Sequence, residues 1–198
     1  MASSSAKGPS GPVVVVTGTS GAGKGTIERM LLERIPELEL AVSATTRERR
    51  PTEENGVHYW FLTDEEFDGR LAEKGFLEYV TFPWGQRSGT LRSEIDRIRA
   101  AGRVPLLDLE TDGAAYVQKT VPGAVTIFVT APTFEELERR LRARATESAG
   151  EIEERLALAR EQLEQADEFD HLIVNDDRER AAAEVEVIVR GAIGAQVP

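Results

Sequence analysis

A glycine-rich loop between a hydrophobic run and a helical pattern constrains this chain more than any other feature. The run covers residues 13–17 (VVVVT), which are β-branched and typical of a strand that is buried on both faces of a parallel sheet. The loop GTSGAGK covers residues 18–24, and apolar side chains then recur at helical spacing until Pro36. A strand, a glycine loop and a helix in this order form the setting in which a loop binds phosphate groups.

The loop has the composition of a P-loop, which binds the phosphates of a nucleoside triphosphate. Its glycines let successive N–H groups face one anion, the helix N-terminus adds a partial positive charge, and Lys24 can reach the β- and γ-phosphates. A plain glycine turn with an exposed lysine is disfavoured, because both flanking elements fit the motif. We therefore expect the phosphates of ATP to bind to Gly18, Thr19, Ser20, Gly21, Ala22, Gly23, Lys24, Gly25 and Thr26.

One P-loop position departs from the usual pattern. Gly25 stands where a Mg²⁺-binding Ser or Thr is usual, and Thr26 comes one residue later. Mg²⁺ readily keeps several water ligands. The sequence Gly-Lys-Gly-Thr at 23–26 resembles that of adenylate-type nucleotide kinases, and this resemblance implies that Mg²⁺ is held largely through water.

The rest of the chain predicts strands that alternate with helices. Strands are expected at 38–42, 58–62, 76–80, 104–109, 126–130 and 172–174, and helices at 64–74, 91–101, 134–144, 152–164 and 178–191. Residues 43–57 are expected to form a loop, and residues 1–12 a flexible tail. The alternation predicts an α/β fold with a parallel sheet, in a single domain over 13–198.

Composition excludes several classes of protein. The chain has no Cys, which excludes disulfides and cysteine metal sites, and 24 basic against 35 acidic residues give a net charge of −11. This balance disfavours binding to nucleic acids or acidic membranes. No apolar run approaches the roughly 18 residues of a membrane span. The first residues also lack the apolar segment of a secretory signal, so we expect a cytoplasmic protein.

Behind the P-loop, seven short motifs follow the order found in the guanylate kinase family. They are SATTRERRP at 43–51, HY at 58–59, FLE at 76–78, GQRSGT at 85–90, LDLE at 107–110, LERRLRAR at 137–144 with IEERL at 152–156, and IVNDD at 173–177. Between about residues 13 and 190 the chain resembles that family, which phosphorylates GMP with ATP in purine nucleotide metabolism. The resemblance implies a P-loop NTPase core (13–42, 92–137, 166–198), a GMP-binding insertion (43–91) and a helical lid (138–165).

The resemblance also implies a set of residues that bind GMP. Guanine presents N1–H and the 2-amino group side by side, and Glu78 is expected to accept from both. Glu110 is a second acceptor for the 2-amino group, and Ser43 a donor to O6. Adenine lacks both donors, and sites of this kind discriminate by about 10⁴-fold or more. The other residues expected to bind substrate are Arg47, Arg50, Tyr59, Thr90 and Asp108.

Arginines supply the charge that phosphoryl transfer requires. Arg47 and Arg50 are suited to bidentate contact with the phosphate of GMP. Arg140 and Arg144 lie one helical turn apart and Arg155 lies on the next helix, so a closing lid would bring them to the transferring group. The expected catalytic set is therefore Lys24, Arg47, Arg140, Arg144 and Arg155.

Two further residues are assigned through the resemblance. Asn175 is expected on the adenine side of ATP, and Asp108, at the end of a buried strand, is expected to hold water molecules around Mg²⁺. The expected partners are ATP and GMP, and the expected assembly is a monomer or a small homo-oligomer.

Some family positions are altered, and they leave other functions open. The altered residues are Arg49, Thr52, Ser88, Glu110, Asp112 and Ala145. Ser88 stands where a phosphate-contacting tyrosine is usual, so a kinase for another nucleoside monophosphate is one alternative. A non-catalytic guanylate-kinase-like module that binds a phosphorylated partner is a second, which Lys24, Arg144 and Arg155 disfavour. A signalling NTPase is disfavoured by Gly25.

Overall fold

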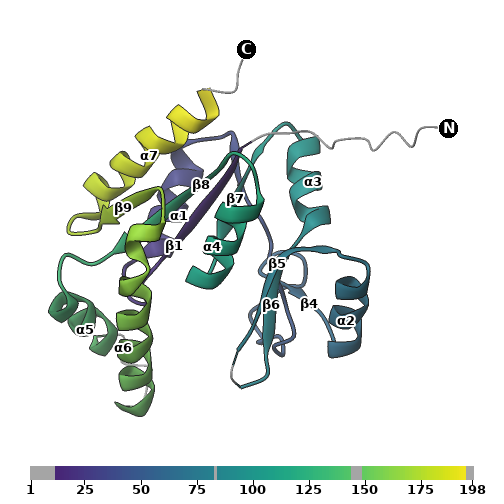
Figure 1. The fold of residues 1–198 in the computed structure, drawn as a ribbon, viewed down its shortest axis with the longest axis horizontal. Helices are drawn as coiled ribbons and strands as arrows, with labels where there is room; N and C mark the ends of the chain where they lie inside the picture. Colours follow the sequence, from purple (N-terminus) through teal and green to yellow (C-terminus); the bar gives the residue numbers. More distant parts are fainter. Residues whose placement is uncertain (1–11, 83, 144–148, 195–198) are drawn as a thin grey trace.

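The computed structural model describes residues 12–82, 84–143 and 149–194, which form two β-sheets and the helices that pack on them (Figure 1). The strands are β1 (Val13–Gly18), β2 (Leu38–Leu40), β3 (Ala44–Thr45), β4 (Trp60–Phe61), β5 (Phe76–Thr81), β6 (Arg87–Leu91), β7 (Val104–Asp108), β8 (Ala124–Thr130) and β9 (His171–Val174). The helices are α1 (Lys24–Arg34), α2 (Asp64–Ala72), α3 (Arg92–Ala100), α4 (Thr111–Thr120), α5 (Phe134–Arg142), α6 (Ala149–Glu164) and α7 (Arg178–Gly194), with a 3₁₀ turn at Ala166–Glu168.

The larger sheet has the strand order β2-β7-β1-β8-β9, and all of its strand pairs are parallel. Its central strand, β1, is buried along its whole length, as its β-branched residues predict. Val16 pairs with Asp108 on β7, and Gly18 pairs with Val129 on β8. The carboxyl ends of these strands therefore meet at one edge, where α/β sheets bind ligands. The predicted α/β fold with a parallel sheet is confirmed.

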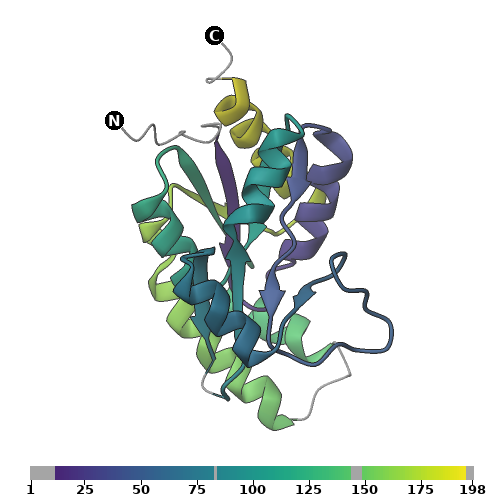
Figure 2. The same ribbon diagram turned by 90° about the vertical axis from the view of Figure 1, so that its right-hand side faces the viewer.

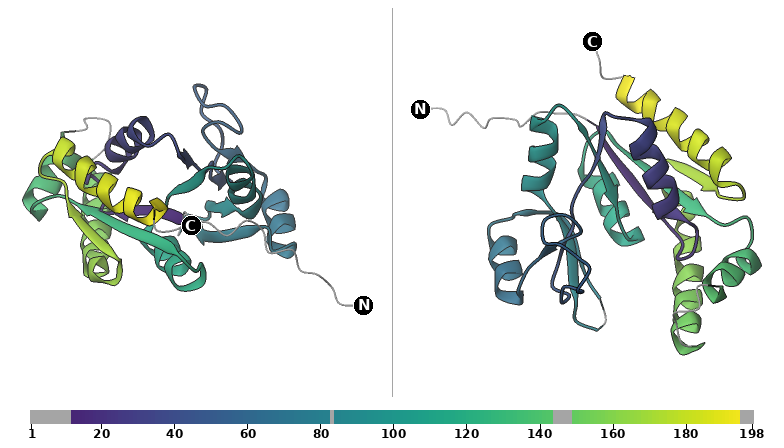
Figure 3. Two further views of the ribbon diagram at one scale, coloured as in Figure 1. Left: turned by 90° about the horizontal axis from the view of Figure 1, so that it is seen from above. Right: turned by 180° about the vertical axis from the view of Figure 1, so that it is seen from behind.

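Helices cover both faces of this sheet. Val14 and Val16 pack against α1 and α7, whereas Val13 and Val15 pack against α3 and α4. In Figure 1 helix α4 lies on the near side of the sheet, and in the view from behind in Figure 3 helices α1 and α7 face the reader. Because both faces are covered, consecutive residues of β1 are all apolar until Thr17.

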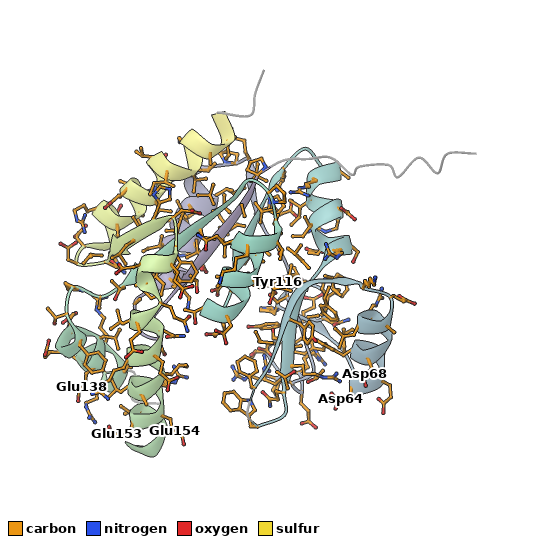
Figure 4. All side chains as sticks on the ribbon, in the orientation of Figure 1. Asp64, Asp68, Tyr116, Glu138, Glu153 and Glu154 are labelled. Carbon is orange, nitrogen blue, oxygen red and sulfur yellow. The ribbon has the colours of Figure 1, made fainter. Side chains whose placement is uncertain are left out.

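A smaller sheet, with the order β4-β3-β6-β5, lies beside the core together with α2 (Figure 1). Its hydrophobic centre is Phe67 of α2, whose ring stacks on Phe76 of β5 with 4.3 Å between the centroids. Arg87 of β6 lies over the Phe67 ring and pairs with Asp64 and Asp68, the two α2 carboxylates labelled in Figure 4. The connection from β3 to β4 extends away from the body of the molecule (Figure 2).

Helices α5 and α6 pack on each other at the P-loop end of the core. Leu137 and Leu141 of α5 and Leu156 of α6 share one apolar cluster. Arg142 forms ion pairs with Glu138 on α5 and Glu153 on α6 at 2.7 and 2.9 Å, and both carboxylates are labelled in Figure 4. The two helices therefore share apolar and charged contacts.

Several elements differ from the sequence predictions. Helix α4 was missed, because its small and polar residues give a weak apolar pattern although Ala114 and Val117 are fully buried. Strand β3 lies where a loop was expected and β6 lies where no strand was predicted, and they form because each pairs with the other in antiparallel register. Within the described residues no helix is long and apolar enough to cross a membrane.

Removing the Phe67 ring should destabilise the smaller sheet. Phe67 is fully buried, so Phe67→Ala should lower the free energy of unfolding by about 3–5 kcal/mol, measured by urea denaturation. As a control, Tyr116→Ala on α4 (Figure 4) removes an aromatic ring that is 51% exposed and should have a small effect. A Phe67→Ala loss no larger than that of the control would contradict the central role of this ring.

Candidate functional site

The loop after β1 depends on three glycines with positive φ angles. Gly18, Gly21 and Gly23 have φ of 138°, 86° and 91°. A Cβ atom on Gly18 would lie 2.0 Å from the Val129 carbonyl oxygen, so no other residue fits there. Lys24 opens α1 and its Nζ donates to the Gly18 carbonyl at 3.2 Å. The ammonium group therefore lies across the loop, in the position from which a P-loop lysine reaches phosphates.

Asn175 and Arg140 hold the outer side of this loop. Asn175 Nδ2 donates to the Ala22 carbonyl at 2.7 Å, and Arg140 Nη2 donates to the Asn175 carbonyl at 2.9 Å. The connection between β9 and α7 thus contacts both the loop and α5. An open pocket of about 400 Å³ lies between them, and it is lined by Gly23, Thr26, Arg140, Asn175, Asp176, Asp177 and Arg178. Its size and its place beside the loop suit the nucleoside end of a nucleotide.

A pair of carboxyl groups, Glu28 and Asp108, lies on the inner side of the loop. Glu28 is 6% exposed, and burial together with Asp108 raises its pKa to about 8, although Lys24 opposes the shift. Asp108 keeps an exposed surface at the sheet edge, yet the protein around its carboxyl group raises its pKa as well. Glu28 and Asp108 form a hydrogen bond that raises the pKa of Glu28 and opposes the rise in that of Asp108. The proton between the two carboxyl groups is therefore held by Glu28, which donates to Asp108. Sequence analysis missed Glu28, because a glutamate in an amphipathic helix is usually exposed.

Glu78 is the buried carboxylate of the smaller sheet. It is 5% exposed, and its Oε1 accepts from the Thr90 N–H at 2.9 Å and the Thr90 hydroxyl at 2.8 Å. Burial raises the pKa of Glu78, and the two bonds from Thr90 oppose that shift. A Cβ atom on Gly113 of α4 would lie 2.7 Å from Glu78 Oε2. The glycine therefore lets α4, which begins just after Glu110, lie directly against this carboxylate.

Gln162 of α6 connects three parts of the site, and sequence analysis missed it. Its Oε1 accepts from the Ser20 N–H at 3.1 Å, and its Nε2 donates to Glu110 Oε2 at 3.2 Å. The side chain is 3% exposed. One amide thus links the P-loop, helix α6 and the carboxylate that follows β7. No local motif marks such a residue, because its partners are distant in the chain.

Arg47 lies in the β3–β4 connection and is held by Glu53. The guanidinium forms two bonds to the carboxylate at 2.8 and 2.9 Å, and this contact lowers the pKa of Glu53 to about 2. The Tyr59 ring lies 5.3 Å from the Arg47 guanidinium carbon. The Arg50 N–H also donates to Glu53. Arg47, Arg50 and Tyr59 therefore come from one compact loop, whose organising residue, Glu53, was missed.

The remaining predicted residues are spread around the same region. The Ser43 carbonyl accepts from the Trp60 N–H at 2.9 Å, and Ser88 Oγ donates to the Ala44 carbonyl at 3.1 Å. Arg155 is partly buried on α6 and interacts with other groups of the protein. Arg144 and Ala145 lie outside the described residues.

Comparisons with known proteins agree on one family. The family model described as guanylate kinase matches residues 10–192. A guanylate kinase of Prochlorococcus marinus is 44% identical over 189 residues, which are 96% of this chain and 98% of that protein. A guanylate kinase of Synechococcus sp. (strain CC9311) is 46% identical over 172 residues, 87% of this chain and 90% of that protein. The crystal structure of a guanylate kinase from Anaplasma phagocytophilum matches with a TM-score of 0.73 and 27% identity, and covers 92% of this chain and 86% of that one.

Proposed function

The chain belongs to the guanylate kinase family. We propose which of its residues bind ATP, which bind GMP and which promote phosphoryl transfer between them. The reaction yields ADP and GDP. The observation that carries the proposal is the juxtaposition of a P-loop with Lys24 and a separate buried carboxylate, Glu78, that contacts α4 of the core. The P-loop suits the phosphates of ATP, the phosphoryl donor. The Glu78 carboxylate suits the guanine base of GMP, the acceptor.

The donor nucleotide occupies the P-loop and the pocket beside it. The loop residues 18–26 surround the phosphates, and Lys24 neutralises the β- and γ-phosphate oxygens. Asn175 lies on the nucleoside side, and its bond to the Ala22 carbonyl supports the shape of the loop. Helix α5 supports the loop from outside, because a Cβ at Gly21 would lie only 3.0 Å from Leu141 Cγ.

The acceptor occupies the smaller sheet and the β3–β4 connection. Glu78 accepts from N1–H and the 2-amino group of guanine, Glu110 accepts from the 2-amino group, and Ser43 donates to O6. Thr90 orients the Glu78 carboxylate through its two bonds. Arg47, Arg50 and Tyr59 bind the phosphate of GMP, which competes with Glu53 for Arg47.

Transfer requires charge and alignment rather than a general base. An oxygen of the ionised GMP phosphate attacks the γ-phosphorus, and the bond from that phosphorus to the β–γ bridging oxygen breaks to release ADP. The negative charge on the equatorial oxygens of the transferred phosphoryl group is balanced by Lys24, Arg47, Arg140, Arg144 and Arg155. We assign residues 138–165 to a lid over the core (13–42, 92–137, 166–198), and residues 43–91 to the acceptor region.

Members of the family generally use a divalent metal ion with ATP. The residues beside the P-loop fit such an ion, since Asp108 and Glu28 place carboxyl groups near Lys24 and Glu28 Oε1 has no hydrogen-bond partner. We propose that Asp108 holds Mg²⁺ through water. When bound, Mg²⁺ neutralises charge on the phosphates of ATP. We further propose that the protein works in the cytoplasm as a monomer or small homo-oligomer, which light scattering can test.

Replacing Lys24 tests the donor site. Lys24→Ala removes the side-chain cation of the loop and should lower kcat by at least about 10²-fold, because a contact to transition-state charge is lost. A coupled assay of ADP release with ATP and GMP measures this effect. Lys119→Ala, on the exposed face of α4, is the control and should leave kcat unchanged. An unchanged rate in Lys24→Ala would rule out the P-loop assignment.

Replacing Arg155 tests the lid. Arg155→Ala should lower kcat by more than it raises KM for ATP. The reason is that Arg155 should contact the transferred phosphoryl group mainly when the lid is closed and negative charge develops in the transition state. The control is Arg160→Ala on the same helix, whose guanidinium lies over the Phe134 ring at 4.4 Å. A mutant that loses only affinity for ATP would show that Arg155 binds the ground-state nucleotide instead.

Replacing Glu78 tests the acceptor. In Glu78→Gln the amide oxygen can still accept from Thr90, which leaves the NH₂ group in place of Oε2, where it cannot accept from guanine. Losing a charge-assisted bond costs about 1.5–3 kcal/mol, so KM for GMP should rise roughly 10- to 100-fold while KM for ATP stays nearly constant.

A panel of acceptors completes this test on the parent enzyme. Inosine monophosphate keeps N1–H but lacks the 2-amino group, so it should be a poor but detectable acceptor. AMP should be nearly inert. If AMP or a pyrimidine monophosphate is turned over as fast as GMP, the pocket around Ser88 binds a different acceptor. The assigned role of Glu78 would then be wrong.

A further inference from the structure

The P-loop of this chain lacks a side chain at position 25, and a neighbouring carboxylate lies beside the resulting space. A Cβ atom built on Gly25 would have Glu28 Oε2 at 4.0 Å as its neighbour. A Ser or Thr hydroxyl at position 25 would therefore project close to the Glu28 carboxylate. Glu28 lies one helical turn after Lys24, so both residues lie on the same side of α1.

The Glu28 carboxyl group is buried but incompletely satisfied. The residue is 6% exposed, and its Oε1 has no hydrogen-bond partner. Buried polar atoms are nearly always hydrogen-bonded in folded proteins, and an exception calls for an explanation such as an absent ion. The unpaired Oε1 is therefore a candidate ligand atom for such an ion.

The partners of Glu28 indicate what kind of ligand it serves. It hydrogen-bonds Asp108 of β7 and interacts electrostatically with Lys24. Two carboxyl groups in contact repel each other when both are ionised, and a divalent cation removes that repulsion. Among the described residues no group of three or more acidic or histidine side chains forms a complete metal site. The pair therefore needs further oxygen ligands, which the phosphates of a nucleotide and water supply.

We propose that Glu28 takes over the role of the missing P-loop hydroxyl and, together with Asp108, holds the divalent cation that accompanies ATP. The proposal rests on the ATP site assigned above. Mg²⁺ is usually bound by one or two carboxylates plus phosphate oxygens and water, which matches this set of groups. The Glu28 carboxylate thus replaces the hydroxyl group that Gly25 lacks.

A structural role for Glu28 makes a different prediction. If Glu28 only donates a hydrogen bond that positions Asp108, then Glu28→Gln, which keeps a donor, should bind metal as the parent does. If Glu28 holds the cation, then Glu28→Gln and Glu28→Leu should both bind it more weakly. Gly25→Ser combined with Glu28→Leu restores the usual hydroxyl and should recover part of the affinity.

The experiment measures Mn²⁺ binding to the full-length protein saturated with a non-hydrolysable ATP analogue, by electron paramagnetic resonance. Glu28→Gln and Glu28→Leu should raise the Kd for Mn²⁺ by about 10-fold or more, the usual effect of changing a group around a metal. Gly25→Ser/Glu28→Leu should bind Mn²⁺ at least about threefold more tightly than Glu28→Leu alone. Glu33→Gln, an exposed acid on the same helix, should match the parent.

The controls separate the possible failures. Binding of the analogue in EDTA should be equal in all variants, which shows that each still folds; if Glu28→Leu fails this check, the isosteric Glu28→Gln decides. Unchanged Mn²⁺ affinity in the folded Glu28 variants would overturn the inference and leave the kinase assignment intact. A parent protein that binds the Mn²⁺ complex but transfers no phosphoryl group to GMP would contradict the proposed function instead.

Discussion

The parallel pairing of β1 with β7 and β8 is the constraint on which the rest of the site depends. Because Val16 pairs with Asp108 and Gly18 with Val129, the P-loop and the acidic end of β7 emerge at the same sheet edge. The close approach of Gly18 to Val129 fixes where the loop begins. A shift of β7 along β1 would move Asp108 away from Lys24, whose charge acts on the Asp108 carboxyl group.

The net charge of −11 shapes how this protein binds anions. Two of the arginines assigned to phosphates already have acidic partners, since Arg47 pairs with Glu53 and Arg140 with Glu136. These partners keep the guanidinium groups in fixed positions without a ligand. A phosphate that binds either guanidinium must compete with its carboxylate partner.

The sequence was sufficient to predict the elements that have local signals. The P-loop follows from glycines and Lys24 between a valine run and a helix, and the parallel sheet follows from the alternation of elements. Residues whose importance arises only from tertiary contacts were missed. Glu28 has the pattern of an exposed helical glutamate, Gln162 connects Ser20 with Glu110 across 142 and 52 residues, and α4 has too few large apolar residues to be recognised.

The position of Glu78 shows how acceptor recognition is connected to the core. The carboxylate lies at the register shift of β5, between Phe76 and Glu78, and the pairing with β6 brings Thr90 to its Oε1. On its other side Gly113 belongs to α4, which begins after Glu110 at the end of β7. Glu110 in turn is held by Gln162, which also accepts from the Ser20 N–H of the P-loop. The carboxylates assigned to guanine are thus connected by direct contacts to the loop assigned to ATP. The relative position of the two sheets therefore sets the relative position of both sites, and in-line transfer depends on holding the two substrates in the right geometry.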